Sequence, residues 1–484
     1  MGAAHRKDDF MKRLLALLLA LGLLGSVTPV FAEEDGVPAA PDGGGDVTVM
    51  EPAQLPAWAM PELADGYALG LFGDEINTTA YSQTVTLEQL DKLTGIAADK
   101  LALLNVDQRS SAGSFVIDTT RGGVLNALYM EALPYAFEGV DAGAVEFLSA
   151  LGVVHGDGDS LALDRPCTLL EACAFTNRMI LALYDSQNAG SLGLLWKAEG
   201  NGNTLYLLGS IHTDRNNLYP FHKQLRDIIT SSELAAFELD FNNQEGVDEF
   251  VAMQTYSDGT TLKDHISPEL YQEVMEAMAP LGMPEDQVAQ FKPWALANSF
   301  TALSMMDETT SGNGMAPDLY VNAKATNAGI PVEGIETYAF QGKIFDDLSD
   351  EYQENYLAMT LTMYLGASAG EGLTEEEQAE LEEALKEQEA AVSRWMGQWK
   401  TRDIEAFSKD YPKDDIQGNT TDELNSKLFE GRDPNMIAWA DNYLKQEGSH
   451  TGLMTVGAGH MIGKTGVVQG LKDLGYTVEV MPLP

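Results

Sequence analysis

The sequence predicts an α/β fold in residues 189–484: a mixed, largely parallel sheet with helices on both faces, preceded by a small, mostly helical module in residues 56–188. Three observations lead to this prediction. Apolar, strand-like runs alternate with helical patterns after residue 190, as they do in parallel sheets with crossover helices. Two of these runs flank Gly200-Asn201-Gly202, which is a hairpin signal. Before residue 189, helical stretches follow one another without strand-like runs.

The first 55 residues have no pattern of a folded domain. Lys12 and Arg13 precede an apolar stretch from Leu14 to Leu24, and Val30-Phe31-Ala32 offers a small-x-small cleavage site. This is the pattern of a signal peptide over residues 1–32, and its apolar stretch is too short to span a bilayer comfortably. Residues 33–55 are rich in Gly, Pro and Asp and read as a flexible linker. We therefore expect a secreted or cell-surface protein without a transmembrane span in its mature chain.

The charge of the chain excludes some partners. Lys and Arg number 29 against 74 Asp and Glu, which gives a formal net charge of −45 at pH 7. Nucleic acids and anionic membranes repel such a surface, so neither is expected as a partner. The acidity is explained by solubility, and it does not by itself establish a metal site.

Residues 56–188 contain three related stretches, each with a helix, a turn and a second helix. The second helices are expected to be capped by Thr86, by Thr119 or Thr120, and by Thr168. Cys167 and Cys173 suit neither a metal cluster nor an easy disulfide, so we expect both to be small buried residues.

These stretches resemble S-layer homology repeats, most closely in LGVVHGDGDS (151–160) and TLLEA (168–172). Leu169 stands where that family has Arg, and Gly123 stands where it has Glu. The resemblance implies attachment to a secondary cell-wall polymer. A helical spacer that binds nothing is the alternative.

In residues 189–484 the elements are expected in a βα order after the hairpin. Strands are expected at 233–240, 329–336, 453–460 and 476–483; helices at 217–232, 268–281, 284–309, 315–328, 373–402, 433–447 and 464–474.

The pattern Gly-x-x-His occurs twice, at Gly209–His212 and Gly457–His460, and each copy closes an apolar run. Two other such runs end in Glu238 and Glu336. Because the carboxyl ends of parallel strands share one edge, these four side chains are expected to converge where open α/β sheets bind ligands. Imidazole and carboxylate groups together suit a divalent metal ion (Mn, Co or Zn), with one Glu free to take a proton from a bound water.

Each of these residues also has a structural interpretation. A single strand-end His is more often a hydrogen-bonded structural residue than a ligand, and a Glu after an apolar run is often a cap. The segment around Gly463-Lys464-Thr465 fits a loosened phosphate-binding loop. We reject that interpretation because too few residues follow it to complete a nucleotide-binding sheet.

The large module resembles the TraB/GumN family, which is related to the TIKI metalloproteases. The resemblance lies in LLWKAEGNGNTLYLLGSIH (194–212), AAFELD (235–240), FKPWALA (291–297), the stretch 317–341, FEGRDPNMIAWADNYL (429–444) and the stretch 456–481. It implies a metal-dependent hydrolase site in which His212, His460, Glu238 and Glu336 hold the metal. Glu238 and Glu336, with Arg432, are also its catalytic residues. Gln341 and Asp318 match more weakly, and capping or solvation explains them equally well.

The sequence therefore leaves three hypotheses. The first is a secreted, wall-attached, metal-dependent hydrolase that acts on a peptide or small-molecule substrate, with a peptidase preferred. The second is a non-catalytic binding protein that uses the same site for a ligand or for cell-wall material. In the third, only the helical module functions, as a cell-wall anchor.

Overall fold

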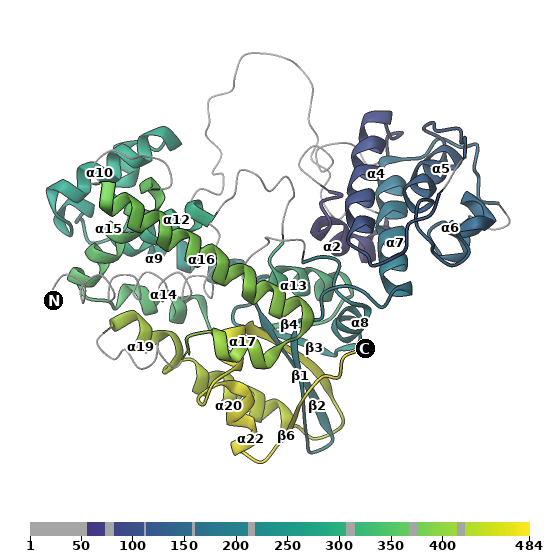
Figure 1. Ribbon diagram of the computed structural model, residues 1–484. Coiled ribbons are helices and arrows are strands. Elements are labelled where there is room, and N and C mark those ends of the chain that lie inside the picture. Colours follow the sequence, from purple (N-terminus) through teal and green to yellow (C-terminus); the bar gives the residue numbers. More distant parts are fainter. Residues whose placement is uncertain are drawn as a thin grey trace.

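The computed structural model describes most of the chain after residue 55 (Figure 1). The described residues are 56–72, 82–110, 113–156, 160–211, 218–305, 315–366, 375–413 and 422–484. The expected signal peptide, the expected linker and His212 lie outside them.

A six-stranded sheet forms the centre of the large module. Its strands are β1 (Leu194–Gly200), β2 (Asn203–Ser210), β3 (Leu234–Phe237), β4 (Val332–Gly334), β5 (Thr451–Gly457) and β6 (Thr477–Val480). The spatial order is β4-β3-β5-β2-β1-β6. Strands β4, β3, β5 and β2 run parallel, whereas β1 is antiparallel to both its neighbours. The predicted mixed, largely parallel sheet is thus confirmed.

The hairpin between β1 and β2 forms at the predicted glycines. Asn201 (φ 54°) and Gly202 (φ 89°) both adopt left-handed conformations, as a two-residue Asn-Gly hairpin turn requires. The Asn201 side-chain amide donates to the carbonyl of Leu444, which ties the turn to the end of a helix beside β5.

Helices cover both faces of the sheet and extend into a lobe beside it (Figure 1). Those of the large module are α8 (Lys223–Ser231), α9 (Gln244–Met253), α10 (Pro268–Met278), α11 (Glu285–Val288), α12 (Pro293–Met305), α13 (Pro317–Asn327), α14 (Tyr338–Asp346), α15 (Asp350–Gly366), α16 (Glu375–Thr401), α17 (Ile404–Asp410), α19 (Glu423–Phe429), α20 (Asp433–Leu444), α21 (Ala458–Met461) and α22 (Val467–Asp473). Helices α8 and α13 pack on one face, and α20 and α22 pack on the other. The connections that leave β3 and β5, which are neighbours, therefore run to opposite faces. Open α/β sheets bind their ligands beside such a switch point.

Two expected elements differ in the structure. The helix expected at 284–309 is broken into α11 and α12, because Pro293 lacks an N–H and disfavours a helical conformation at the residue before it. The strand expected at 453–460 ends at Gly457, and the next four residues form the helical turn α21. His460 is therefore held on a helical turn beyond the strand.

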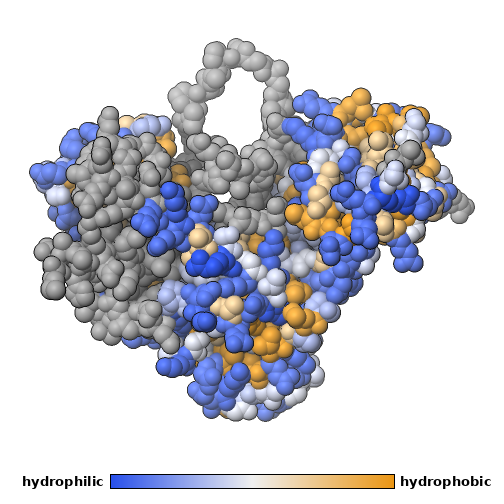
Figure 2. Space-filling view, viewed as in Figure 1, coloured by the Kyte–Doolittle hydropathy of each residue, from blue (hydrophilic) through white to orange (hydrophobic). Residues whose placement is uncertain are grey.

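The N-terminal module is helical, as predicted. Its helices are α2 (Met60–Ala68), α4 (Leu87–Ala102), α5 (Arg121–Ala132), α6 (Ala144–Ala150) and α7 (Leu169–Ser186). Thr86 and Thr168 form capping boxes and Thr120 caps α5, so the threonine prediction is confirmed. Cys167 and Cys173 are free and fully buried. On the face that Figure 2 shows, apolar residues gather on this module.

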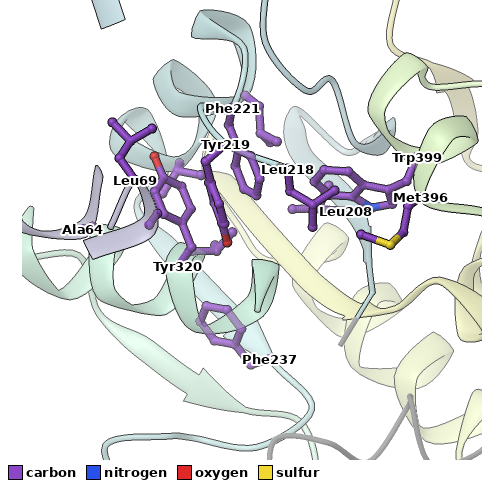
Figure 3. Close-up of a cluster of buried hydrophobic side chains, with 14 of the residues drawn as sticks. Ala64, Leu69, Leu208, Leu218, Tyr219, Phe221, Phe237, Tyr320, Met396 and Trp399 are labelled. Atoms are coloured by element: carbon purple, nitrogen blue, oxygen red, sulfur yellow. The ribbon is translucent and has the colours of Figure 1, made fainter. Parts of the chain in front are cut away.

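The helical module packs directly on the large module through α2 and α13. Asp65 in α2 accepts hydrogen bonds from the Tyr320 hydroxyl (2.6 Å) and from the Lys324 ammonium group (2.5 Å), and it is 4% exposed. Ala64 of α2 and Leu69, the residue that follows this helix, lie in one buried cluster with Tyr320 (Figure 3). A second contact joins the Lys100 ammonium group in α4 to the carbonyl of Tyr219 (3.0 Å).

None of the described helices is long and apolar enough to cross a membrane.

Candidate functional site

The first residues of the two Gly-x-x-His motifs lie side by side, because β2 and β5 are neighbouring parallel strands. Ser210 pairs with Gly457 in the ladder. A Cβ atom at Gly209 would lie 3.1 Å from the Cα of Ala458 and 3.2 Å from its Cβ, so glycine lets the first motif pack tightly against the second. The Trp399 indole N–H donates to the carbonyl of Gly209 (2.7 Å). The strand that leads to His212 is thus fixed up to Ser210.

Glu238 and Glu336 lie just beyond the neighbouring strands β3 and β4. The pairing continues past the strand ends, where the Glu336 N–H donates to the carbonyl of Glu238 (2.9 Å). Both residues are buried, at 5% and 8% exposure. The backbone thereby places the two carboxylates next to each other.

The guanidinium of Arg432 lies between these carboxylates. Its Nη2 donates to Glu238 Oε2 (2.5 Å) and to Glu336 Oε2 (2.8 Å), and its Nε donates to both oxygens of Glu336 (3.1 and 3.0 Å). Arg432 is fully buried at the start of α20. Burial alone would lower the pKa of Arg432, but the charges of the two carboxylates outweigh it and raise that pKa. The three side chains therefore form a closed ionic cluster.

His460 is held by Asp433, the residue that follows Arg432 in α20. Its Nδ1 lies 2.7 Å from Asp433 Oδ1. The other carboxylate oxygen of Asp433 accepts from the Lys413 ammonium (2.8 Å) and from the Thr465 hydroxyl (3.0 Å). Burial would raise the pKa of Asp433, but His460 and Lys413 lower it. An ionised Asp433 accepts the Nδ1–H of His460, so that Nε2 is the ring nitrogen left outside this hydrogen bond.

Several buried polar atoms around this cluster have no hydrogen-bond partner within the described part of the chain. Among them are Nε2 of His460, Nη1 of Arg432 and Oε1 of Gln341. Gln341, in α14, donates from Nε2 to Glu336 Oε2 (2.9 Å). Because buried polar groups rarely lack partners, these atoms mark a position where a ligand is expected.

The donor set fits a divalent cation only in part. His460 Nε2 lies 4.0 Å from Glu238 Oε1, and Asp433 supports the ring from behind, as carboxylates commonly do for metal-binding histidines. Glu336 has both oxygens engaged by Arg432. Among the described residues no group of three or more His, Cys, Asp or Glu side chains could hold a metal ion. A cation at the His460–Glu238 edge would therefore need further ligands.

The structure brings Glu238, Glu336, Arg432 and His460 together, while His212 lies outside the described residues. Asp318 is buried in the first turn of α13. Sequence reasoning missed Asp433 and Lys413. The sequence around Asp433 contains a cue to the site, because Asp433 stands between Arg432 and Pro434 at the start of a helix. The sequence around Lys413 has no distinguishing pattern.

A family model described as the TraB/PrgY/gumN family matches residues 194–480, from the first residue of β1 to the last residue of β6. No curated protein and no solved structure matches the chain. Because the matched region is more than half of the chain and spans the whole sheet that carries the site, the chain belongs to the TraB/PrgY/gumN family.

Proposed function

We propose that this chain is an exported, wall-attached, metal-dependent hydrolase that acts as a peptidase. One observation carries the proposal: the buried Nε2 of His460 has no partner among the described residues and lies 4.0 Å from Glu238 Oε1. A neutral imidazole fixed from behind by a carboxylate is a common metal ligand.

The buried charges of the cluster favour a cation. Glu238, Glu336 and Asp433 carry three negative charges, whereas Arg432 and Lys413 carry two positive charges. Because isolated buried charge is costly, this excess of one negative charge favours a cation over an anion near His460 and Glu238. His212 is the third ligand in this proposal.

The residues of the chain have distinct roles in the proposed reaction. A bound Mn, Co or Zn ion would supply a nucleophilic water at neutral pH. Glu238 accepts the Gly457 N–H at Oε1 (2.7 Å), which fixes the carboxylate that would help to hold the ion, and Glu336 would take a proton from that water. Arg432 aligns Glu238 with Glu336, and its unpartnered Nη1 would stabilise an oxygen that becomes negatively charged.

Two sequence features support export and attachment. The signal-like segment 1–32 would direct secretion, and the helical module would bind a secondary cell-wall polymer. Both remain proposals, to be tested by N-terminal sequencing of the exported protein and by sedimentation of the full chain with purified wall material.

A metal measurement tests the proposed centre. The purified chain is dialysed without chelator, and its metal is measured beside His460→Ala, His212→Ala and Glu238→Ala. His450→Ala is a matched control, because His450 pairs with Glu233 at the exposed start of β5. We expect bound metal in the wild type and the control but not in the three site variants. Equal metal content in all five proteins would refute the centre.

A specific observation favours a second candidate, a binding protein without turnover. Arg432 already binds Glu238 and Glu336, the two carboxylates that a catalytic metal centre would use. This candidate predicts that no peptide or ester in a library is cleaved by the metal-loaded chain. Cleavage that Glu238→Gln abolishes would favour the hydrolase.

A further inference from the structure

Tyr411 carries a buried hydroxyl that has no assigned role. The residue is 7% exposed, and its hydroxyl oxygen has no hydrogen-bond partner within the described residues. Leaving a buried hydroxyl unpaired costs free energy, so such a group in a folded chain calls for an explanation.

This hydroxyl lies on the backbone of the second Gly-x-x-His motif. A Cβ atom at Gly459 would stand 2.9 Å from the Tyr411 oxygen and 3.1 Å from two ring carbons. Any larger residue at position 459 would push the ring away. The second glycine of the motif thus lets Tyr411 come within one residue of His460.

The ring has little freedom to turn elsewhere. Tyr411 stacks on Phe407 at a centroid distance of 5.5 Å and packs against Trp395 at the same distance. Two residues later, Lys413 binds Asp433. The short segment 411–413 therefore contacts both the turn that carries His460 and the carboxylate that orients it.

The hydroxyl remains a hydrogen-bond donor under ordinary conditions. Burial, with smaller contributions from the charges of Asp433 and Glu238, raises the pKa of Tyr411. The phenol therefore stays protonated in the field of two carboxylates with which no hydrogen bond is formed. The unpartnered Nη1 of Arg432 is a second donor in this cluster, so the site has donors in need of an acceptor.

We propose that the Tyr411 hydroxyl donates a hydrogen bond to a carbonyl-type oxygen of the ligand bound beside His460. This rests on the proposed function in placing the substrate at that position. For an amide substrate the acceptor is the carbonyl oxygen, which gains negative charge when water attacks. The hydroxyl keeps its proton throughout, and Tyr411 is by this assignment a catalytic residue.

The chain offers a matched control in Tyr443. That residue is 4% exposed, its hydroxyl also has no partner among the described residues, and burial raises its pKa to about 12. It packs on Gly452, where a Cβ would lie 2.6 Å from the hydroxyl oxygen. Gly452 is near the start of β5 and Gly459 follows its end, so the two tyrosines are alike in setting but lie at opposite ends of one strand.

The test measures binding of acetohydroxamic acid, a carbonyl probe that is uncharged at pH 7, to the full chain by calorimetry. Loss of one hydrogen bond predicts that Tyr411→Phe binds the probe about two- to tenfold more weakly, with Tyr443→Phe like the wild type. Equal affinity of Tyr411→Phe and wild type, equal weakening in both variants, or no binding to the wild type would each overturn the proposal.

Thermal unfolding provides a second criterion. Removing a hydroxyl that has no partner should leave the midpoint of Tyr411→Phe unchanged or higher, whereas a fall would show a structural hydrogen bond and overturn the proposal. The metal content separates the two hypotheses. If the wild type contains metal and Tyr411→Phe binds the probe as tightly as the wild type, only this inference is rejected. If the wild type contains no metal and Tyr411→Phe binds the probe more weakly, only the metal-dependent function is rejected.

Discussion

Two buried arginines, Arg402 and Arg432, satisfy the hydrogen-bond donors of their guanidinium groups in different ways. Arg402 follows α16 with a left-handed backbone (φ 56°) and is 4% exposed. Its guanidinium donates to the carbonyls of Leu192, Gly193, Met481 and Pro482 and to the side-chain oxygen of Gln224. All of these partners are uncharged, and burial lowers the pKa of Arg402 to about 10.

Arg432 instead binds two carboxylates and leaves Nη1 without a partner among the described residues. The guanidinium of Arg402 donates from all three of its nitrogens, which joins the C-terminal segment to the start of β1. The difference teaches that burial of a charge does not identify a functional site. What distinguishes Arg432 from Arg402 is the unused hydrogen-bonding capacity of its Nη1 beside two carboxylates.

The largest expected effect is that of Arg432→Met. The substitution leaves two buried carboxylates without their cation, which should cost about 3–5 kcal/mol of unfolding free energy. Urea denaturation followed by circular dichroism measures it. Arg109→Met is the control, since Arg109 pairs with the exposed Asp141 and should not shift the midpoint. If Arg432→Met loses no more unfolding free energy than Arg402→Met, the expected difference between the two arginines is contradicted.

Arg402→Met should cost less, about 2–3 kcal/mol, because the groups left behind are uncharged oxygens. Arg402→Lys should not restore stability, since a single ammonium cannot reach acceptors on three sides. The metal content of Arg402→Met and of Arg402→Lys should equal that of the wild type. Loss of metal would mean that Arg402 also supports the site.

Asp433→Asn tests the support of His460 through metal affinity, since its stability also falls when buried Lys413 loses its carboxylate. The amide removes the charge that keeps the proton on Nδ1 of His460, so metal affinity should fall about 10- to 100-fold. Competition with a chelator of known affinity measures the fall. An unchanged affinity would show that Asp433 only binds Lys413.

The smallest effect concerns Lys100, a third buried cation that donates to a carbonyl. Burial, with a smaller contribution from Lys400, lowers the pKa of Lys100 to about 8. The folded state therefore binds this proton less tightly than the unfolded state. Unfolding free energy should accordingly rise from pH 8 to pH 10 in the wild type relative to Lys100→Met, by on the order of 1 kcal/mol per pH unit. A parallel pH dependence of the two proteins would refute this.

The sheet could be predicted because its strands are apolar, short and bounded by turn residues. Gly200-Asn201-Gly202 specified the hairpin, and the threonines specified the helix starts of the N-terminal module. The break before Pro293 and the end of β5 at Gly457 were missed. In both places the local apolar pattern continues, while backbone geometry ends the element.

The site could be predicted only as a group of residues. Glu238 and Glu336 were found because each closes an apolar run. That Arg432 would lie between them depends on how α20 packs against the sheet, which no local pattern encodes. Tyr411 and Lys413 reach the site from a segment without periodicity, and only the close approach at Gly459 reveals the former.

The contact between α2 and α13 has a consequence for how the two parts of this chain are inherited. Asp65 accepts from both Tyr320 and Lys324 in a buried setting. A chain that acquired the sheet without the helical module would expose Tyr320 and leave Lys324 without this carboxylate. Substitutions at position 65 should therefore be matched by changes at position 324 among homologous chains. Recombination that exchanges the helical module independently of the large module should be selected against.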